Sequence, residues 1–262
     1  QIFFFEEVIF FESLQSLTIF LIFCSLFFLL GFIDDKYFIN ANVKFLLSII
    51  FVTIILFFDE TLIINNINFK FINFNLKFLS IPWTVLCFLL FINAFNMFDG
   101  FNLQSSSYAI FLLVVLFIGS NYSFFVLFLL FGMIVFSFLN YDYKSFLGDG
   151  GTYLVSFIAS SLFIKLYNYN HIQFVDEIVC LMIIPGIDLM RLFIQRIIIH
   201  KKSPFSPDRN HLHHYLLSRY NTNKTFLYLN CLIIIPYLLG KIFSIFFIMI
   251  CIQMIIYFFI LF

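Results

Sequence analysis

Charged residues are scarce in this chain. Only 11% of its 262 residues are charged, and 14 Lys and Arg balance 14 Asp and Glu to a formal net charge of zero. Soluble domains carry about a quarter of their residues as charged side chains, so this composition excludes one. The neutral balance indicates neither nucleic acid nor an acidic macromolecule as a partner.

The chain also lacks a pattern of paired cysteines and a recognisable leader segment. The five cysteines are far apart and lie within apolar runs (Cys24, Cys87, Cys180, Cys231 and Cys251), which fits neither a disulfide framework nor paired metal ligands. The chain begins with Gln inside an apolar stretch, and no charged region with a cleavage site precedes it, so a signal peptide is not indicated. We expect instead that the N-terminal part of a longer protein is missing.

Apolar residues make up 63% of the chain, and the mean hydropathy is +1.07. These values predict a single all-α polytopic membrane domain over residues 1–262. A span needs about 20 apolar residues, with a usable range of about 17–25. About nine runs approach that length: 14–33, 42–58, 80–98, 105–119, 122–139, 151–167, 175–190, 225–240 and 243–261.

The basic residues set the orientation. Threading the runs alternately through a bilayer puts most Lys and Arg on one face, which the positive-inside rule makes cytoplasmic. That face receives Lys36, Lys44, Lys144, Arg191, Arg196, Lys201, Lys202, Arg209, Arg219 and Lys224. The other face receives Lys70, Lys77, Lys165 and Lys241. Segment 59–79, on that other face, alternates apolar and polar residues with period two, which predicts a small extracytoplasmic β-hairpin.

Four polar segments interrupt the apolar runs, and all four emerge on the predicted cytoplasmic face. The first is the pair Asp34-Asp35, which closes the first run. Adjacent carboxylates suit a hard cation such as Mg²⁺, and each raises the proton affinity of its neighbour. An ordinary solvated helix end is the alternative.

The second segment runs from Asn93 to Asn102. If the helix continues that far, Asn93, Asn96 and Asp99 recur every third residue and line one face. Two amides and an acid on one stripe can bind a cation or a polar ligand. Helix–helix hydrogen bonding by the amides is the alternative.

The third segment, 148–152, contains Gly148, Asp149 and Gly150 at the start of a run. Glycines let a backbone approach a phosphate, and the N–H groups of a helix N-terminus bind anions. Asp149 would hold a metal ion bridging to those phosphates, although a glycine turn capped by Asp would look the same.

The fourth segment, 203–214, ends in a histidine cluster within a basic loop, 191–224. A helix could bring His211 and His214 to one face, but not His213. Imidazoles and Arg209 could donate to phosphate oxygens, and a zinc site is the competing interpretation. For Arg191 and Arg196, nearby in this loop, we expect interfacial anchoring beside anionic lipid.

Taken together, the four segments resemble the polyprenyl-phosphate N-acetylhexosamine-1-phosphate transferases, of the glycosyltransferase 4 type. The resemblance runs from about Gly31 to Tyr215 with the motifs in the family's order. The string Ser-Pro-Phe-Ser-Pro-Asp-Arg-Asn-His-Leu-His-His is similar to the branch that acts on UDP-N-acetylglucosamine. The family's first two helices and their glycine-containing loop are absent from this chain.

The resemblance implies roles for particular residues. Catalytic roles fall to Asp34, Asp35, Asp99, His211, His213 and His214. Substrate-binding roles fall to Asn93, Asn96, Asn102, Arg209, Gly148 and Gly150, and metal binding falls to Asp149 and Asp35. In one departure, Asn102-Leu103-Gln104 stands where the family commonly has an Asp followed by Gly-Leu, at a position associated with the nucleotide base.

The resemblance also implies an activity. A Mg²⁺-dependent enzyme (Mn²⁺ being the alternative metal) would transfer a sugar-1-phosphate from a UDP-N-acetylhexosamine to polyprenyl phosphate in the bacterial plasma membrane. UMP would be released, in the first membrane step of a cell-envelope polysaccharide pathway such as lipopolysaccharide synthesis. The partners would be the lipid, the nucleotide sugar and the bilayer, with no nucleic acid; the oligomeric state is open, a homodimer being one option. A non-catalytic lipid-phosphate binder and a membrane transporter are the alternatives.

Overall fold

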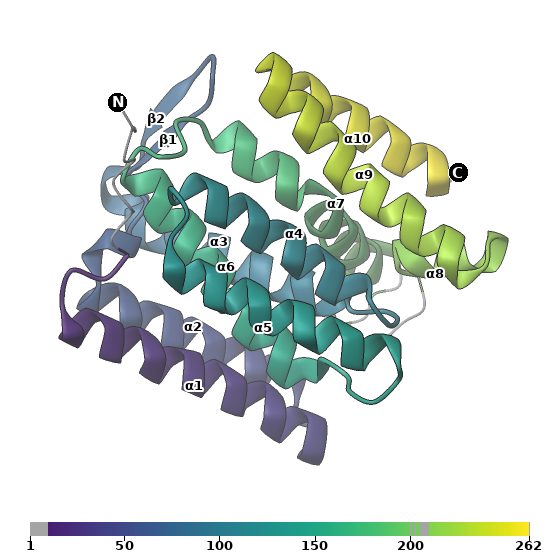
Figure 1. Cartoon of the computed structure of the whole chain (residues 1–262), viewed down its shortest axis with the longest axis horizontal. Coiled ribbons are helices and arrows are strands. Elements are labelled where there is room, and N and C mark those ends of the chain that lie inside the picture. Colours follow the sequence, from purple (N-terminus) through teal and green to yellow (C-terminus); the bar gives the residue numbers. More distant parts are fainter. Residues whose placement is uncertain (1–9, 200, 202, 205–209, 262) are drawn as a thin grey trace.

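The protein is a bundle of α-helices with one small hairpin (Figure 1). A computed structural model describes residues 10–199, 201, 203–204 and 210–261. The helices within these ranges are α1 (Leu14–Tyr37), α2 (Ala41–Phe58), α3 (Ser80–Phe98), α4 (Gln104–Gly119), α5 (Phe124–Tyr141), α6 (Gly148–Asn168), α7 (Val175–Ile194), α8 (Leu212–Arg219), α9 (Thr222–Phe243) and α10 (Phe246–Leu261). A π-helical turn, Gln195–Ile199, continues α7.

Every expected span coincides with a helix, but nine spans are not confirmed. Among the described residues, six helices are long and apolar enough to cross a membrane: α1, α2, α3 with its preceding turn, α5, α6 and α9. The helices α4 and α10 are apolar but have only 16 residues each, or about 24 Å at 1.5 Å per residue. The helix α7 contains Asp176, Glu177, Asp188 and Arg191, and these charges keep it out of the set.

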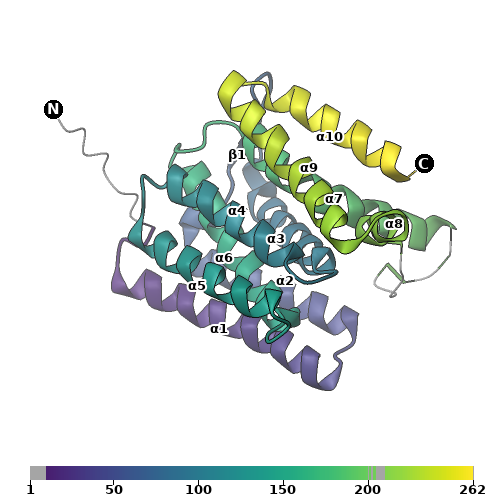
Figure 2. The same cartoon turned by 45° about the vertical axis from the view of Figure 1, so that its right-hand side comes forward.

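The helix α6 forms the centre of the bundle. It packs against α1, α3 and α4, and 78% of its most apolar 18-residue stretch is buried inside the protein. Figures 1 and 2 show α1 and α2 on one side of it and α9 and α10 on the other. Gly31 allows the closest approach, because a Cβ there would lie 2.2 Å from the Asp149 carbonyl oxygen. The start of α6 is therefore pressed against the end of α1.

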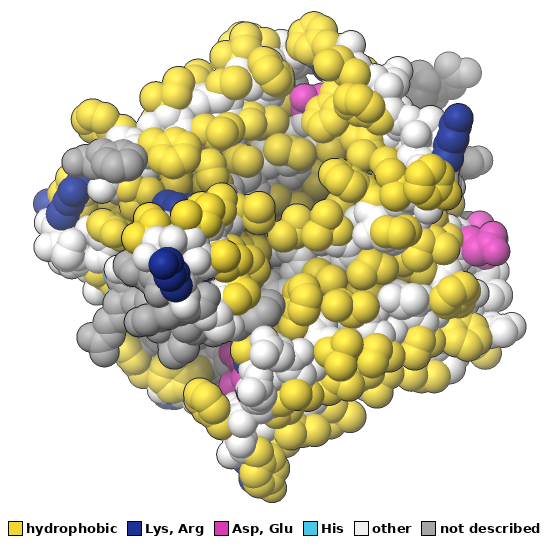
Figure 3. Space-filling model, turned by 180° about the vertical axis from the view of Figure 1, so that it is seen from behind, with side chains coloured by type: hydrophobic (Ala, Val, Ile, Leu, Met, Phe, Trp, Pro, Cys, Tyr) yellow, Lys and Arg dark blue, Asp and Glu magenta, His cyan; other side chains and the backbone are white. Residues whose placement is uncertain are grey.

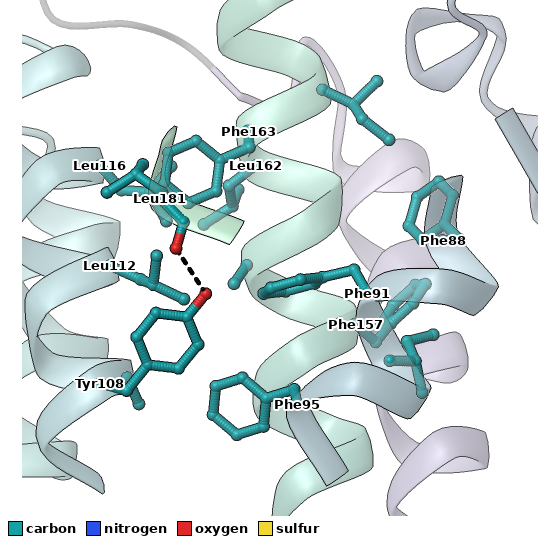
Figure 4. Packing of buried hydrophobic residues seen from close by; sticks show 14 of the residues in the cluster. Phe88, Phe91, Phe95, Tyr108, Leu112, Leu116, Phe157, Leu162, Phe163 and Leu181 are labelled. Carbon is teal, nitrogen blue, oxygen red and sulfur yellow. Dashed lines mark hydrogen bonds between the residues drawn. The ribbon is translucent and has the colours of Figure 1, made fainter. Parts of the chain in front are cut away.

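Aromatic rings fill the space between the central helices. Phe88, Phe91 and Phe95 of α3 pack near Phe157 of α6, and Tyr108 of α4 donates a hydrogen bond to the Leu181 carbonyl of α7 at 3.1 Å (Figure 4). Satisfying the hydroxyl in this way removes the cost of burying it. Four helices are thus joined in one apolar core.

The outside of the bundle is apolar as well. Hydrophobic side chains cover most of the face seen in Figure 3, with few charged side chains among them. Large exposed residues include Phe57 on α2 and Phe128, Phe131 and Phe138 on α5. A soluble protein rarely exposes so much apolar surface, whereas lipid tails solvate it. The protein is a multi-pass membrane protein.

The predicted hairpin is present. Strands β1 (Asn66–Asn68) and β2 (Asn73–Asn75) pair antiparallel, with Ile67 opposite Phe74. The hairpin lies where α2 ends and α3 begins, and we call this the hairpin end of the bundle. At the opposite end, which we call the site end, α1 and α3 finish and α2, α4 and α6 begin. Which end faces the cytoplasm stays a prediction from the basic residues.

Candidate active site

The first three polar segments meet at the site end around one lysine. Lys44, in the first turn of α2, forms ion pairs with Asp34 of α1 and with Asp149 of α6, the latter at 3.1 Å. The amide of Asn96 on α3 donates to Asp149 Oδ1 at 2.9 Å and to the hydroxyl of Thr152 at 2.8 Å. Segments more than one hundred residues apart therefore form a single polar network.

Lys44 is the member that the motifs did not indicate. In the sequence it served only as one basic residue among ten that set the orientation. Its position follows from topology: it lies ten residues after Asp34, in the first turn of the next helix, and therefore at the same end of the bundle. Both Asp34 and Asp149 turn a carboxylate oxygen toward its ammonium group. The position between them is a cation position.

Asp35 makes a different contact from Asp34. Its two carboxylate oxygens accept hydrogen bonds from the backbone N–H groups of Asp149 and Gly150, at 2.9 and 3.1 Å. Gly148 has a φ of +62°, and a Cβ there would lie 2.7 Å from an Asp35 oxygen. The anion position at the start of α6, which we expected a phosphate to use, is therefore filled by a carboxylate from α1. Gly148 and Gly150 make room for α1 in this structure.

The donor set can be tested against Mg²⁺. No three His, Cys, Asp or Glu side chains in the described part of the chain converge closely enough to hold a metal ion by themselves. Mg²⁺, however, is usually bound by one or two carboxylates, with substrate phosphates and water completing its shell. Asp34 and Asp149 fit that pattern, since their oxygens already share one cation position. Asp35 fits it less well, because both of its oxygens bind backbone N–H groups.

Asp99 lies just beyond the end of α3 and is partly buried. Its carboxylate accepts a hydrogen bond from the Ser105 hydroxyl. Burial raises the pKa of Asp99 and the nearby charge of Asp35 raises it further, while the bond from Ser105 opposes them. This acid consequently keeps its proton to higher pH than a solvated aspartate would.

The other amides of the second segment bind the protein itself. Asn93 donates to the Leu89 carbonyl of its own helix at 2.7 Å. Asn102 donates to the Asn140 carbonyl of α5 at 2.9 Å, and Asn140 in turn accepts from the Leu103 N–H. Leu103 has a φ of +70°, a left-handed conformation that is costly for a branched side chain. The expected stripe of Asn93, Asn96 and Asp99 therefore divides, because Asn96 faces the carboxylates whereas Asn93 bonds its own helix. Asn102, outside that stripe, likewise bonds a backbone carbonyl.

The histidine cluster reaches the same end of the bundle. His211 precedes α8 in extended conformation and is not part of a helix. The three rings therefore gather without sharing a helix face. The ring of His211 stacks on that of His213 with 5.4 Å between ring centroids, and the ring centroids of His213 and His214 are 4.2 Å apart. His213 also reaches the second segment, because a Cβ on Gly100 would lie 2.4 Å from its Nε2.

Burial dominates the chemistry of His213. Its side chain is only 5% exposed. This burial, with the neighbouring His214 and His211, lowers the pKa of His213 to about 3. His213 is therefore a neutral imidazole across the physiological range, with one N–H donor and one acceptor nitrogen.

The interfacial anchoring that we expected for the arginines is wrong for both of them. Arg196 is 4% exposed and donates to the Pro204 carbonyl at 2.6 Å. Arg191 forms an ion pair with Asp188 at 2.8 Å and also donates to the Asn210 carbonyl. Both side chains turn inward and bind backbone carbonyls, at Pro204 and at Asn210. Arg209 lies outside the described residues.

An apolar cavity of about 310 Å³ lies between α3, α6, α7 and the hairpin. Its lining runs from Ala94, two residues before Asn96, to Ile67 at the hairpin end, with Trp83, Phe163 and Met182 between them. The cavity extends along the bundle toward the hairpin end, and none of its lining residues belongs to the polar network.

Comparison with known proteins gives a consistent result. The model of glycosyl transferase family 4 matches residues 17–167. A Bacillus subtilis protein named as a probable undecaprenyl-phosphate N-acetylglucosaminyl 1-phosphate transferase is 28% identical over 82% of this chain and 61% of its own length. The Salmonella typhi undecaprenyl-phosphate alpha-N-acetylglucosaminyl 1-phosphate transferase is 25% identical over 78% of this chain and 59% of its own. The chain thus spans about three fifths of these relatives. More than half of its residues match the family model, and the chain belongs to glycosyl transferase family 4.

Proposed function

We propose that the protein transfers N-acetylglucosamine-1-phosphate, or the 1-phosphate of a similar N-acetylhexosamine, from a UDP-sugar to polyprenyl phosphate. A lipid phosphate oxygen attacks the β-phosphorus, the bond from that phosphorus to the bridging oxygen breaks, and UMP leaves. The names of the relatives support the lipid acceptor and the sugar phosphate. The observation that carries the proposal is the network of Asp34, Lys44, Asn96 and Asp149 at the site end of the bundle.

The network suits a reaction between two anions, whose repulsion must be cancelled before they can meet. In this proposal Asp149 and Asp34 hold Mg²⁺, or Mn²⁺, which would neutralise the diphosphate and stabilise the charge that develops in phosphoryl transfer. Lys44 supplies a fixed positive charge beside those carboxylates. Neutral His213 has one N–H donor and adds no positive charge that would pair with the carboxylates.

The cavity gives the lipid a place. A polyprenyl chain is an apolar ligand, and pockets for such ligands are concave and lined by apolar side chains. A chain seated there would lie along α3, the helix that carries Asn96 nearer the site end. We propose that the site faces the cytoplasm from a bacterial plasma membrane, which the distribution of basic residues supports, and we assign the reaction to the first membrane step of an envelope polysaccharide pathway.

A product assay tests the proposal. Membranes containing the protein are incubated with radiolabelled UDP-N-acetylglucosamine, polyprenyl phosphate and Mg²⁺, and lipid-linked label and UMP are measured. We expect both to appear together and to disappear with chelator. Retention of polyprenyl phosphate without either product would instead identify a non-catalytic lipid-phosphate binder. Uptake of the label into sealed vesicles without chemical change would identify a transporter.

A further inference from the structure

Asp188, six residues before the end of α7, accepts more hydrogen bonds than any other described carboxylate at the site end, and it has no role in the proposed chemistry. It is 7% exposed. Its Oδ1 accepts from the Tyr257 hydroxyl at 2.7 Å and from Arg191 at 2.8 Å. The Leu212 N–H, at the start of α8, lies 3.2 Å from both of its oxygens. A buried charge is retained when it is paired and hydrogen-bonded in this way.

The second oxygen of Asp188 faces the histidine cluster. Its Oδ2 lies 3.4 Å from Nδ1 of His211. That distance exceeds a normal hydrogen bond, but Nδ1 is buried and makes no hydrogen bond to any other group in the described structure. A carboxylate beside one ring nitrogen favours the proton on that nitrogen, which leaves the other free to accept.

Tyr257 connects this pair to the C-terminal helix. Its hydroxyl is fully buried on α10, donates to Asp188 and accepts from Arg191 Nε at 2.6 Å. Asp188 and Tyr257 are 69 residues apart in the chain. Their contact joins α10 to the C-terminal part of α7, next to His211.

We propose that Asp188 and Tyr257 are positioning residues: Asp188 holds His211 in the Nδ1–H tautomer, and Tyr257 holds Asp188. His211 then presents an unprotonated Nε2 to the site, while His213, packed against Gly100, is held by burial. The statement that His211 faces a reacting phosphate rests on the proposed function. The statement about the tautomer of His211 does not depend on that function.

Two variants separate these statements. In Asp188→Asn, the Tyr257 and Arg191 donors keep the amide oxygen at the Oδ1 position, so the NH₂ faces His211 as a donor and favours the Nε2–H tautomer. In the serine-protease triad, a wrong histidine tautomer lowers turnover up to about 10⁴-fold even though the geometry of the site is intact. For Asp188→Asn we expect turnover to fall by about 10²–10⁴-fold with a nearly unchanged KM. Tyr257→Phe removes the bond to the buried carboxylate and the bond accepted from Arg191, and we expect about a tenfold loss of turnover.

A matched control lies at the hairpin end. Tyr237 of α9 also donates from a buried hydroxyl to a carboxylate, Glu177, at 2.8 Å. Tyr237→Phe therefore removes an equivalent bond far from the histidines and should leave turnover within about twofold of the parent. Equal losses in Tyr257→Phe and Tyr237→Phe would show a general packing effect and overturn the positioning role of Tyr257.

The tautomer is measured without any activity. The protein is labelled with ¹⁵N-histidine, and the His211 signals are assigned by their loss in His211→Gln. We expect the Nδ1–H form in the parent and the Nε2–H form in Asp188→Asn. The Nε2–H form in the parent, or the same tautomer in both proteins, would overturn the inference. A protein without transferase activity that shows the expected switch would refute the proposed function and leave the inference standing.

Discussion

Replacing Lys44 with Met tests whether Asp34 and Asp149 share a cation position. The substitution keeps an unbranched side chain of similar length and removes the ammonium. We expect two opposite effects: turnover falls, because a fixed positive charge is lost, while the affinity for a divalent cation rises, because the competing charge has gone. A packing defect would lower both.

The structure sets the size of the effect. The Lys44 side chain is 17% exposed, Asp34 11% and Asp149 28%, so the pairs are only partly screened. Two charges 4 Å apart interact by about 4 kcal/mol at an effective dielectric constant of 20. Much of that interaction is already offset by desolvation of the groups. If about a third of it acts against a bound metal, the metal binds about tenfold more tightly in Lys44→Met.

Mn²⁺ serves as the probe, since its free and bound forms are counted directly by electron paramagnetic resonance. Titration of the parent and Lys44→Met in detergent gives the ratio of affinities, and the product assay gives turnover. Lys36→Met is the control, because Lys36 lies at the same end of the bundle but is exposed and contacts the ring of Tyr37. Unchanged Mn²⁺ affinity in Lys44→Met, or weaker binding, would refute the shared position.

Three further predictions follow from the same contacts. Asp149→Asn should lower turnover by about 10²–10³-fold, the scale for losing one electrostatic group, and a rate equal to the parent with Mg²⁺ still required would exclude Asp149 as a ligand. Gly100→Ala should destabilise the protein by about 1–3 kcal/mol and slow transfer, because the new Cβ meets His213, and thermal melting with the product assay measures both. The pKa of His213 is about 3 in the folded protein against an ordinary 6.5. Between pH 3 and 6.5, His213 is therefore protonated in the unfolded state and neutral in the folded state. Stability is therefore complete above pH 6.5 and falls below it, by up to about 1.4 kcal/mol per pH unit, and melting of His213→Gln should lose that part of the slope.

The positions of the helices could be read from the sequence because a bilayer demands long apolar runs. The assignment of spans was less secure where length and charge conflict. In α7, Asp176 and Glu177 bind groups near the hairpin end, and Asp188 binds Tyr257 and Leu212, so the charges of α7 are satisfied by protein. Hydropathy alone does not register such partners. The hairpin, in contrast, was predictable because period-two alternation is a local property.

Convergence of the polar segments was also predictable, since alternate crossings return the chain to the same end. Their individual contacts were not. Whether Asp34 or Asp35 faces Asp149 depends on how α1 crosses α6, and Gly31 sets that crossing through a backbone contact 118 residues away in the sequence. The role of Tyr257 likewise depends on packing between α10 and α7. Residue types and spacing carry no information about such contacts.

The ion pairs at the two ends of the bundle differ in their charge balance. At the hairpin end, Lys165 pairs with Asp59 at 2.7 Å and Lys241 with Glu177 at 2.7 Å, so that each acid has its own base. Lys165 is 1% exposed, and its amine also donates to the Phe10 carbonyl. One-to-one pairs of this kind are self-contained and have no unmet demand for a further ion.

At the site end one ammonium serves two carboxylates, and a third carboxylate lies against the start of α6. Lys44 contacts Asp34 and Asp149, while Asp35 faces a helix N-terminus, which contributes about half an elementary positive charge. Three negative charges against about one and a half positive charges leave an excess that would repel a nucleotide diphosphate. A divalent cation would reverse that sign, so the charge balance of this network favours metal binding before, or together with, the nucleotide. Calorimetric titration provides the check. Binding of the UDP-sugar to the parent protein should be undetectable without Mg²⁺ and should appear when Mg²⁺ is added. Binding of the nucleotide sugar without metal would contradict this charge argument.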